Sequence, residues 1–280
     1  MKRMIAELIE QRFGLPSTAG HDTPAEGELT AILNHRTHRR YTDMPISEDL
    51  MQQVLAAGLS APAKSDLQQV AVLRVENLGI RRAVAELLPA MPWVAQAARF
   101  LVVCGGSRRI RRVCELRGIP FANDHLDAFL NAASDAAMVL QNLIRAASAA
   151  GLGACPISVI RNHATHIAEL LALPDHVFPL AGLCLGWPSR EGFVSLRLPM
   201  ALTVHVTATT IPTSRPRSMA TTAAAMAATT FPRATGARSS VSASHRSMAG
   251  RRTRPGRSRC PNGRILAPSF AARVSSWTSE

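Results

Sequence analysis

Apolar residues at helical spacing mark one long segment of the chain. Between Leu126 and Ala150 they recur every three or four positions, which places them on one face of a helix. The members of this stripe are Leu126, Phe129, Leu130, Ala133, Ala137, Leu140 and Ile144. The pattern predicts the longest core helix of the protein, ended by the turn Gly151-Leu152-Gly153.

Short apolar runs and amphipathic segments alternate along the rest of the chain. The runs at residues 70–75, 100–104, 154–159 and 178–187 predict strands, and the last of them is nearly continuous, as in a strand buried on both faces. Helices are predicted over residues 1–14, 28–35, 47–58, 79–88 and 161–171. Ser47 is a candidate N-cap because two acids follow it. This alternation predicts an α/β or α+β sandwich around one core sheet.

The pattern stops after Val206. Ser, Thr, Ala, Arg, Pro and Gly dominate the remainder, and a segment of this composition cannot bury enough apolar surface to offset its chain entropy. We therefore predict a disordered, low-complexity tail over residues 207–280. Residues 15–27 form a linker of turn-forming residues after the first helix.

The charge of the chain is concentrated in that tail. The 280 residues carry 32 Lys and Arg against 19 Asp and Glu, a net charge of +13. Residues 207–280 hold 12 Arg, no Lys and one acid, so they carry +11, while the rest of the chain carries +2. The overall charge is therefore no argument for nucleic-acid binding by the folded part.

Cysteine number and hydropathy indicate a cytoplasmic protein with reduced thiols. Five cysteines without a C-x-x-C pair argue against a disulfide framework and a zinc site. We find no apolar run long enough to span a bilayer. Glu7 and Glu10 interrupt the apolar N-terminal stretch, which argues against a signal peptide.

A basic patch at residues 35–40, HRTHRR, is the first candidate site. Its cations and its hydroxyl, placed between a helix and a strand-like segment, suit a phosphate. A solvated basic turn explains the patch equally well. Metal binding by His35 and His38 is the weaker alternative, because no Asp, Glu or Cys clusters with them.

Two further segments could line a ligand. Residues 60–69, SAPAKSDLQQ, combine small residues with polar ones, so the backbone could approach a flat ligand while side chains bond its edge. Residues 151–158, GLGACPIS, place a glycine turn before a strand, but the turn is too short for the G-x-G-x-x-G dinucleotide fingerprint. Cys155 in this segment is interpreted as a small core thiol rather than a nucleophile.

Taken in order, these motifs resemble the nitroreductase family of FMN-dependent NAD(P)H oxidoreductases. The matching series is HRTHRRYTD, SAPAKSDLQ, the long helix, GLGACPIS, LALPDHVFPLAGLCLGWP and SLRLP at 195–199. The LCLGWP and HRTHRRYTD blocks look like those of the oxygen-insensitive NADPH nitroreductase and flavin reductase branch. The resemblance spans residues 28–206 and implies an α+β fold with a central mixed sheet flanked by helices.

The resemblance also implies roles for individual residues. FMN phosphate and ribityl contacts are implied for His35, Arg36, Thr37 and Arg39, and Arg197 would close on the same phosphate. Contacts along the flavin ring edge are implied for Lys64, Ser65, Asp66 and Gln68. The strand passing the flavin would hold Pro156, Ile157 and Ser158, with a backbone N–H near Ser158 facing N5. No catalytic side chain and no metal are implied.

The implied activity is hydride transfer from NADPH or NADH through flavin N5 to nitroaromatics, quinones or flavins. The family is homodimeric, with each FMN held between two chains. Four positions depart from its best-known members: Ser158 and Val159 replace Gly, Met91 replaces Gln and Ser195 replaces Lys. These changes bear on rate and substrate choice more than on FMN binding.

The tail departs from the family altogether. Family members continue after residue 206 with helices that cross to the partner, whereas this composition is typical of a GC-rich gene translated out of frame. In the shifted frame the codon of Met219 fixes a Gly and that of Trp277 fixes an Asp. We hypothesise a one-base shift near Val206–Thr207. The alternative is a genuine basic tail on a flavoprotein-like scaffold, a non-enzymatic protein that binds nucleic acid or an anionic surface.

Overall fold

The computed structural model describes residues 2–207 and divides them into two units. One unit consists of residues 2–34 and 194–207, and the other is His35–Phe193. The predicted domains at 1–27, 28–206 and 207–280 stay predictions. Apart from Thr207, the tail and its hypothesised frameshift lie outside the described residues.

The smaller unit is held together by one buried arginine. It contains helices α1 (Ile5–Phe13) and α2 (Gly27–Leu33) and the short turn η3 (Met200–Leu202). Arg12, in the last turn of α1, donates from Nε and Nη2 to the carbonyl oxygen of Leu33 at 2.9 and 2.7 Å. Its Nη1 donates to the carbonyl oxygen of Ser195 at 2.8 Å, so one guanidinium joins three segments.

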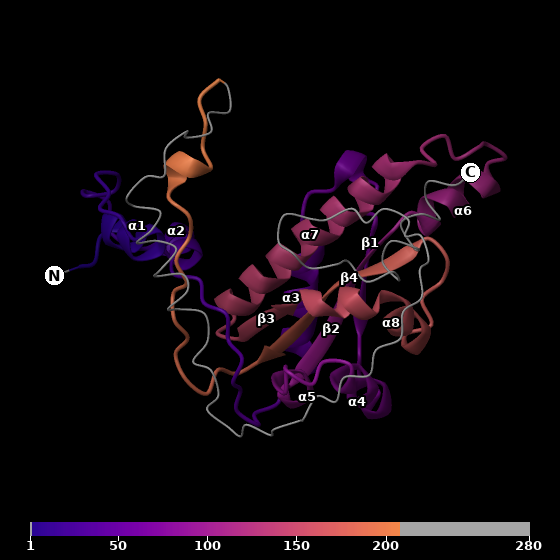
Figure 1. The fold of residues 1–280 in the computed structure, drawn as a ribbon, viewed down its shortest axis with the longest axis horizontal. Helices are drawn as coiled ribbons and strands as arrows, with labels where there is room; N and C mark the ends of the chain where they lie inside the picture. The colour runs from indigo at the N-terminus through magenta and orange to yellow at the C-terminus, as the bar shows by residue number, and fades with distance from the viewer. Residues whose placement is uncertain (1, 208–280) are drawn as a thin grey trace, which may run out of the picture. The chain divides into compact units, whose positions relative to one another are not determined.

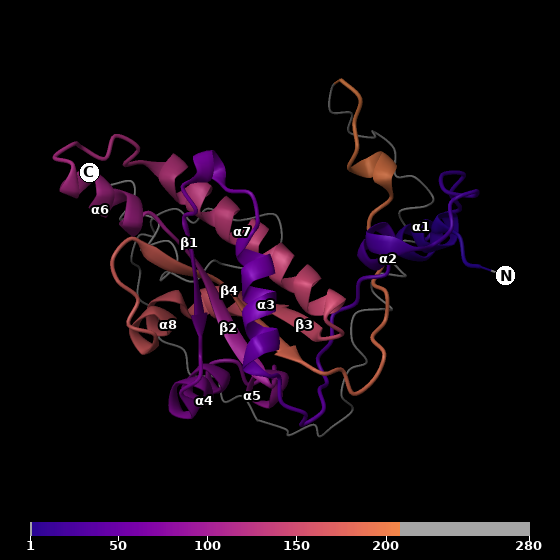
Figure 2. The same ribbon diagram turned by 180° about the vertical axis from the view of Figure 1, so that it is seen from behind.

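The larger unit is built on a four-stranded sheet. Its strands are β1 (Val70–Arg74), β2 (Arg99–Gly106), β3 (Gly153–Ile157) and β4 (Val177–Gly186), in the order β1-β2-β4-β3. Figures 1 and 2 show the sheet between two layers of helices. Side chains alternate between its faces, so odd and even positions of each strand enter different cores.

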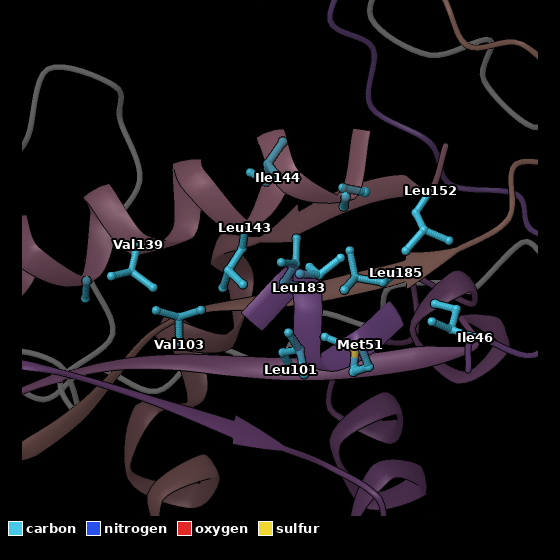
Figure 3. Close-up of a cluster of buried hydrophobic side chains, with 14 of the residues drawn as sticks. Ile46, Met51, Leu101, Val103, Val139, Leu143, Ile144, Leu152, Leu183 and Leu185 are labelled. Carbon is cyan, nitrogen blue, oxygen red and sulfur yellow. The ribbon is translucent and has the colours of Figure 1, made fainter. Parts of the chain in front are cut away.

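Two helices cover one face of this sheet. They are α3 (Glu48–Leu59) and α7 (Leu126–Ala149), and Figure 3 shows their apolar side chains meeting those of β2 and β4. Leu101, Leu183 and Leu143 lie in this core. A Cβ on Gly58 would overlap the buried side chain of Leu143, so glycine lets α3 pack closely on α7.

Shorter helices cover the opposite face. They are α4 (Leu78–Glu86), α5 (Trp93–Gln96), the 3-10 turn η2 (Ser158–His163) and α8 (Ala164–Leu170). Phe100, Cys155 and Cys184 belong to the core beneath them. A further helix, α6 (Arg108–Leu116), follows β2.

The structure confirms the predicted α+β class and corrects two details. Each neighbouring pair of strands is antiparallel, so within residues 2–207 the sheet is not mixed as predicted. Hydrophobic runs carry no information about strand direction, which is why the sequence could not settle it. The helix predicted from Arg161 begins at Ala164, because the first residues fold as the 3-10 turn η2.

The predicted start of the third helix is confirmed by its cap. Ser47 has extended backbone angles, and its hydroxyl oxygen accepts a hydrogen bond from the Leu50 N–H at 3.2 Å. Strand β4 is buried along almost its whole length, as its continuous apolar run predicts.

Candidate functional site

The basic patch crosses the ends of β3 and β4 as an extended segment. The main-chain N–H of His38 donates to the carbonyl oxygen of Ala154 at 3.1 Å, and that of Thr42 donates to Trp187 at 2.9 Å. Tyr41 forms a β-bridge with Pro188, and its hydroxyl donates to the His38 carbonyl at 2.6 Å. The structure therefore joins the first predicted motif to the strand of the third.

A pair of glycines makes this crossing possible. Gly153 and Gly186 face each other across β3 and β4. A Cβ on Gly153 would lie 2.7 Å from the His38 Cβ, and one on Gly186 would lie 2.7 Å from the Tyr41 Cδ1. Both distances are shorter than side-chain contacts allow, so any larger residue would push the basic segment off the sheet.

The cations of the segment already have contacts in the described residues. Arg36 Nη2 lies 2.8 Å from the Glu191 Oε1, and the Glu191 side chain is 76% exposed. The Arg39 guanidinium carbon lies 5.8 Å from the centre of the Trp93 ring. Burial lowers the pKa of His38, and the nearby Arg36 charge lowers it further, against opposing effects of Arg190 and Glu191. The segment thus concentrates guanidinium charge, while burial disfavours the protonated form of His38.

The second predicted motif is a tight loop before β1. Lys64–Asp66 forms the 3-10 turn η1, and Ser65, Asp66 and Gln68 have positive φ angles of 52°, 55° and 49°. Positive φ is uncommon for residues other than glycine, and its concentration in one loop is typical of functional segments. The side chains of Lys64, Ser65, Asp66 and Gln68 are exposed. This loop leads into β1, level with Phe178 at the start of β4, whereas the basic segment borders Gly153 and Gly186 at the other end of the strands. The two motifs are therefore separated by three strand spacings, about 14 Å, across the sheet and by eight residues, about 26 Å, along it.

The third motif ends at the outer strand β3. Pro156 pairs with Leu183 of β4 and is exposed, and Ile157 is buried. Proline is tolerated here because an outer strand leaves one row of backbone groups unpaired. Ser158 is the exposed first residue of η2, directly beyond the strand.

Arg197 is the one predicted site residue in the smaller unit. Its backbone N–H donates to the carbonyl oxygen of Arg12 at 2.8 Å, and its Nη1 donates to the Ser195 Oγ at 2.8 Å. Its predicted role on the cofactor phosphate stays a prediction.

Two residues near the loop were not singled out by the sequence. The carboxylate of Asp135, on α7, accepts hydrogen bonds from the backbone of the loop, and Arg109, on α6, donates to the carbonyl oxygens of Gln68 and Val70, both at 2.8 Å. Asp135 lies on the observed buried face of α7, beside Ala132 and Ala136, which the predicted apolar stripe did not include. Arg109 gave no signal, because it is one of several arginines in α6.

Cys155 lies beside the basic segment and is only 2% exposed. Burial raises the pKa of its thiol, and the Arg39 charge opposes that effect. A buried thiol with a raised pKa is a poor nucleophile.

Among residues 2–207, no group of three or more His, Cys, Asp or Glu side chains could hold a metal ion. No helix in the described part of the chain is long and apolar enough to cross a membrane.

Comparison with known proteins gives consistent matches. The sequence profile of the nitroreductase family matches residues 32–187, a range that contains each predicted site residue except Arg197. The chain is 37% identical over 177 residues to the oxygen-insensitive NADPH nitroreductase of Salmonella typhimurium, covering 63% of this chain and 72% of that protein. It is 34% identical over 179 residues to an FMN reductase [NAD(P)H] of Bacillus subtilis, with the same coverage.

Comparison with solved structures gives matches to the same kind of protein. The NADPH:FMN oxidoreductase of Vibrio harveyi, complexed with NAD+, superimposes with a TM-score of 0.65 at 32% identity, covering 71% of this chain and 84% of that one. Nitroreductase A of Vibrio parahaemolyticus gives a TM-score of 0.62 at 33% identity, covering 65% and 77%. Fold and matches together define an α+β oxidoreductase, as the motifs predict. More specifically, the chain belongs to the nitroreductase family.

Proposed function

We propose that this chain is an NAD(P)H-dependent flavin oxidoreductase that holds FMN between the basic segment, the loop at Lys64–Gln68 and the end of β3. The observation that carries the proposal is the contact of His38 with Ala154, which brings the phosphate-type donors next to the strand expected to pass the flavin. The names of the relatives support both FMN and NADPH as ligands of this class of protein.

The donors at the basic segment fit a phosphate. Guanidinium groups of Arg36 and Arg39, the imidazole of His35 and the hydroxyl of Thr37 offer several N–H and O–H donors in five residues. Glu191, the present partner of Arg36, is 76% exposed, whereas the Arg36 side chain is only 18% exposed. The Glu191 carboxylate can therefore return to water when a phosphate dianion takes its place on the half-enclosed Arg36 guanidinium.

The loop and the strand fit the other end of the ligand. Lys64, Ser65, Asp66 and Gln68 offer exposed polar groups for the edge of a flavin ring, and Pro156, Ile157 and Ser158 offer backbone beside it. The loop and the basic segment of one chain lie at opposite ends of the sheet, so one flavin can contact both only where two chains meet, as in the proposed homodimer. Arg197 is proposed to complete the phosphate site.

FMN, when bound, would supply the redox chemistry that links oxidation of NADPH or NADH to reduction of a nitroaromatic, a quinone or a flavin. In this proposal the residues of the chain bind FMN and orient it. The basic segment neutralises the phosphate, the loop polarises the ring edge, and the two glycines keep the segment on the sheet. A homodimer, with each site between two chains, and a cytoplasmic location are part of the proposal.

Reconstitution tests this function. The purified chain, incubated with FMN and desalted, should stay yellow, lose that colour on addition of NADPH or NADH, and regain it with a nitroaromatic or a quinone. NAD(P)H oxidation should depend on FMN. A colourless chain that takes up no FMN would refute the proposal, and a shifted DNA band from such a chain would favour the basic-tail alternative, which rests on residues outside the described ones.

A further inference from the structure

Asp135 is a buried acid in an otherwise apolar helix face. It lies in the middle of α7, and its neighbours on the buried stripe are Ala132, Ala136 and Val139. Its exposure is 1%. A carboxylate in such a place is costly unless both of its oxygens are hydrogen-bonded.

Both oxygens are bonded, and both partners belong to the loop before β1. The backbone N–H of Lys64 donates to Oδ1 at 2.8 Å, and that of Gln69 donates to Oδ2 at 2.9 Å. These two amides are at the two ends of the loop. One side chain on the longest helix therefore clamps both ends of a six-residue segment.

The clamped loop has a conformation that its own sequence disfavours. Ser65, Asp66 and Gln68 all have left-handed backbone angles, and none is a glycine. Such residues persist only where surrounding structure holds them. Inside the loop the bonds are ordinary turn bonds, from Asp66 N–H to the Ala63 carbonyl at 3.3 Å and from Leu67 N–H to the Lys64 carbonyl at 3.1 Å. These do not join the two ends, so Asp135 supplies the closing contact.

We propose that Asp135 is a positioning residue for the cofactor: it holds residues 64–69 in the conformation that presents Lys64, Ser65 and Gln68 to the flavin edge. The inference rests on the proposed function, because only that function makes the loop a flavin-binding element. Rigid helices hold such groups more accurately than loops do, which is why α7 is a suitable anchor.

Asp135→Asn tests this role with little change in shape. The amide keeps one acceptor oxygen but turns an NH2 group toward the second backbone N–H, so one of the two bonds is lost. Asp127→Asn is the matched control. Asp127 is on the same helix but exposed, and it accepts from the side chains of Asn123 and Asn131 rather than from the loop.

The first readout uses the chain without cofactor. Hydrogen exchange of the Lys64 and Gln69 amides should be about tenfold faster or more in Asp135→Asn than in the wild-type chain and in Asp127→Asn, with far-UV circular dichroism showing that each is folded. Unchanged exchange at both amides would overturn the proposal.

The second readout is FMN affinity from quenching of flavin fluorescence. Asp135→Asn should raise the Kd by about tenfold or more, as expected for losing a hydrogen bond to a charged group, while Asp127→Asn leaves it unchanged. Wild-type affinity and an unaltered visible spectrum in Asp135→Asn would overturn the positioning role alone. If the wild-type chain itself took up no FMN, the proposed function would fail, and the positioning role with it.

A pair of loop variants covers the case in which Asp135→Asn does not fold. Lys64→Pro removes the backbone N–H that donates to Asp135 Oδ1. Lys64 is the first residue of η1, a position where proline is tolerated. Lys64→Ala removes the side chain and keeps this N–H. FMN should bind more weakly to Lys64→Pro than to Lys64→Ala. Equal affinities of these two variants would contradict the proposal.

Discussion

The backbone N–H of His38 and the carbonyl oxygen of Ala154 form a 3.1 Å hydrogen bond between segments more than a hundred residues apart. This bond joins the basic segment to the outer strand β3. It explains how a cluster of cations that could have been a solvated turn becomes part of a site. The glycines facing each other at Gly153 and Gly186 leave the space that the contact needs.

Gly153→Ala should disturb both stability and cofactor binding. The added Cβ would lie 2.7 Å from the His38 Cβ and 3.1 Å from the Pro188 Cγ. We expect overpacking to lower the free energy of unfolding by about 1–3 kcal/mol, measured by urea denaturation, and to weaken FMN binding. Gly79→Ala is the control, because its Cβ meets only the exposed Asn77 Oδ1 at 3.2 Å. A Gly153→Ala chain as stable as Gly79→Ala would contradict the packing described here.

Cysteine labelling should separate buried from accessible thiols. Burial raises the pKa of Cys104 to about 12 and also raises that of Cys155, so both stay protonated and shielded near neutral pH. In the folded chain, iodoacetamide should modify the partly exposed Cys114 and leave Cys104 and Cys155 untouched until denaturant is added. Peptide mass spectrometry checks this. Rapid labelling of Cys155 in the native chain would reopen its role as a nucleophile.

Stability should fall as the pH falls below the ordinary pKa of histidine. Burial lowers the pKa of His38 from 6.5 in the folded chain, so between 6.5 and that lower value the unfolded chain binds a proton that the folded chain does not. The contribution of His38 is therefore complete above 6.5 and lost on acidification. His176 has a lowered pKa too and adds to the effect. The free energy of unfolding of His38→Gln should depend less steeply on pH in this window than that of the wild-type chain, and equal slopes would show that His38 does not titrate as described.

The tail hypothesis predicts a particular gene. A one-base shift near Val206–Thr207 should be visible on comparing the genomic sequence with the gene that encodes this chain. Restoring the frame should give a protein that elutes as a dimer and has a lower KM for NADPH, since the resemblance to the family implies C-terminal helices that cross to the partner. A native protein whose intact mass matches the 280-residue chain of 30.0 kDa would refute the shift.

Local patterns predicted most of the elements but few of the contacts. Helix α7 and strand β4 follow from apolar patterns, and the Ser47 cap follows from three residues. The predicted core face of α7 was wrong: Leu126 and Leu130 are exposed, and the buried face carries Ala132, Ala136, Val139 and Leu143, because small alanines rather than the largest apolar residues pack on the sheet. Helix α6 was missed because four arginines among its nine residues mask a short apolar stripe of Ile110, Val113 and Cys114. The predicted mixed sheet was wrong, because the direction of paired strands depends on chain connections that hydropathy does not encode.

The sequence predicted the residues of the candidate site but not the contacts that hold them in place. The motifs identified the basic segment and the loop, because unusual groups of polar residues stand out in a single sequence. The clamp by Asp135 joins positions 66 and 71 residues apart, and nothing local to α7 specifies those partners. The placement of Arg197 likewise depends on contacts within a unit built from both ends of the described chain.

Equilibrium FMN binding by two variants of one ion pair tests the central claim most directly. If the basic segment holds a phosphate, Glu191 competes with it for Arg36, whose Nη2 lies 2.8 Å from the Glu191 carboxylate. Arg36→Ala should raise the Kd for FMN about tenfold or more, the loss expected for a charge-assisted contact. Glu191→Gln should lower the Kd by up to about fivefold, as expected for removing an exposed carboxylate that competes for Arg36. Opposite shifts in fluorescence titrations support the account; a wild-type chain without FMN affinity, or an Arg36→Ala chain that binds FMN as the wild type does, would contradict it.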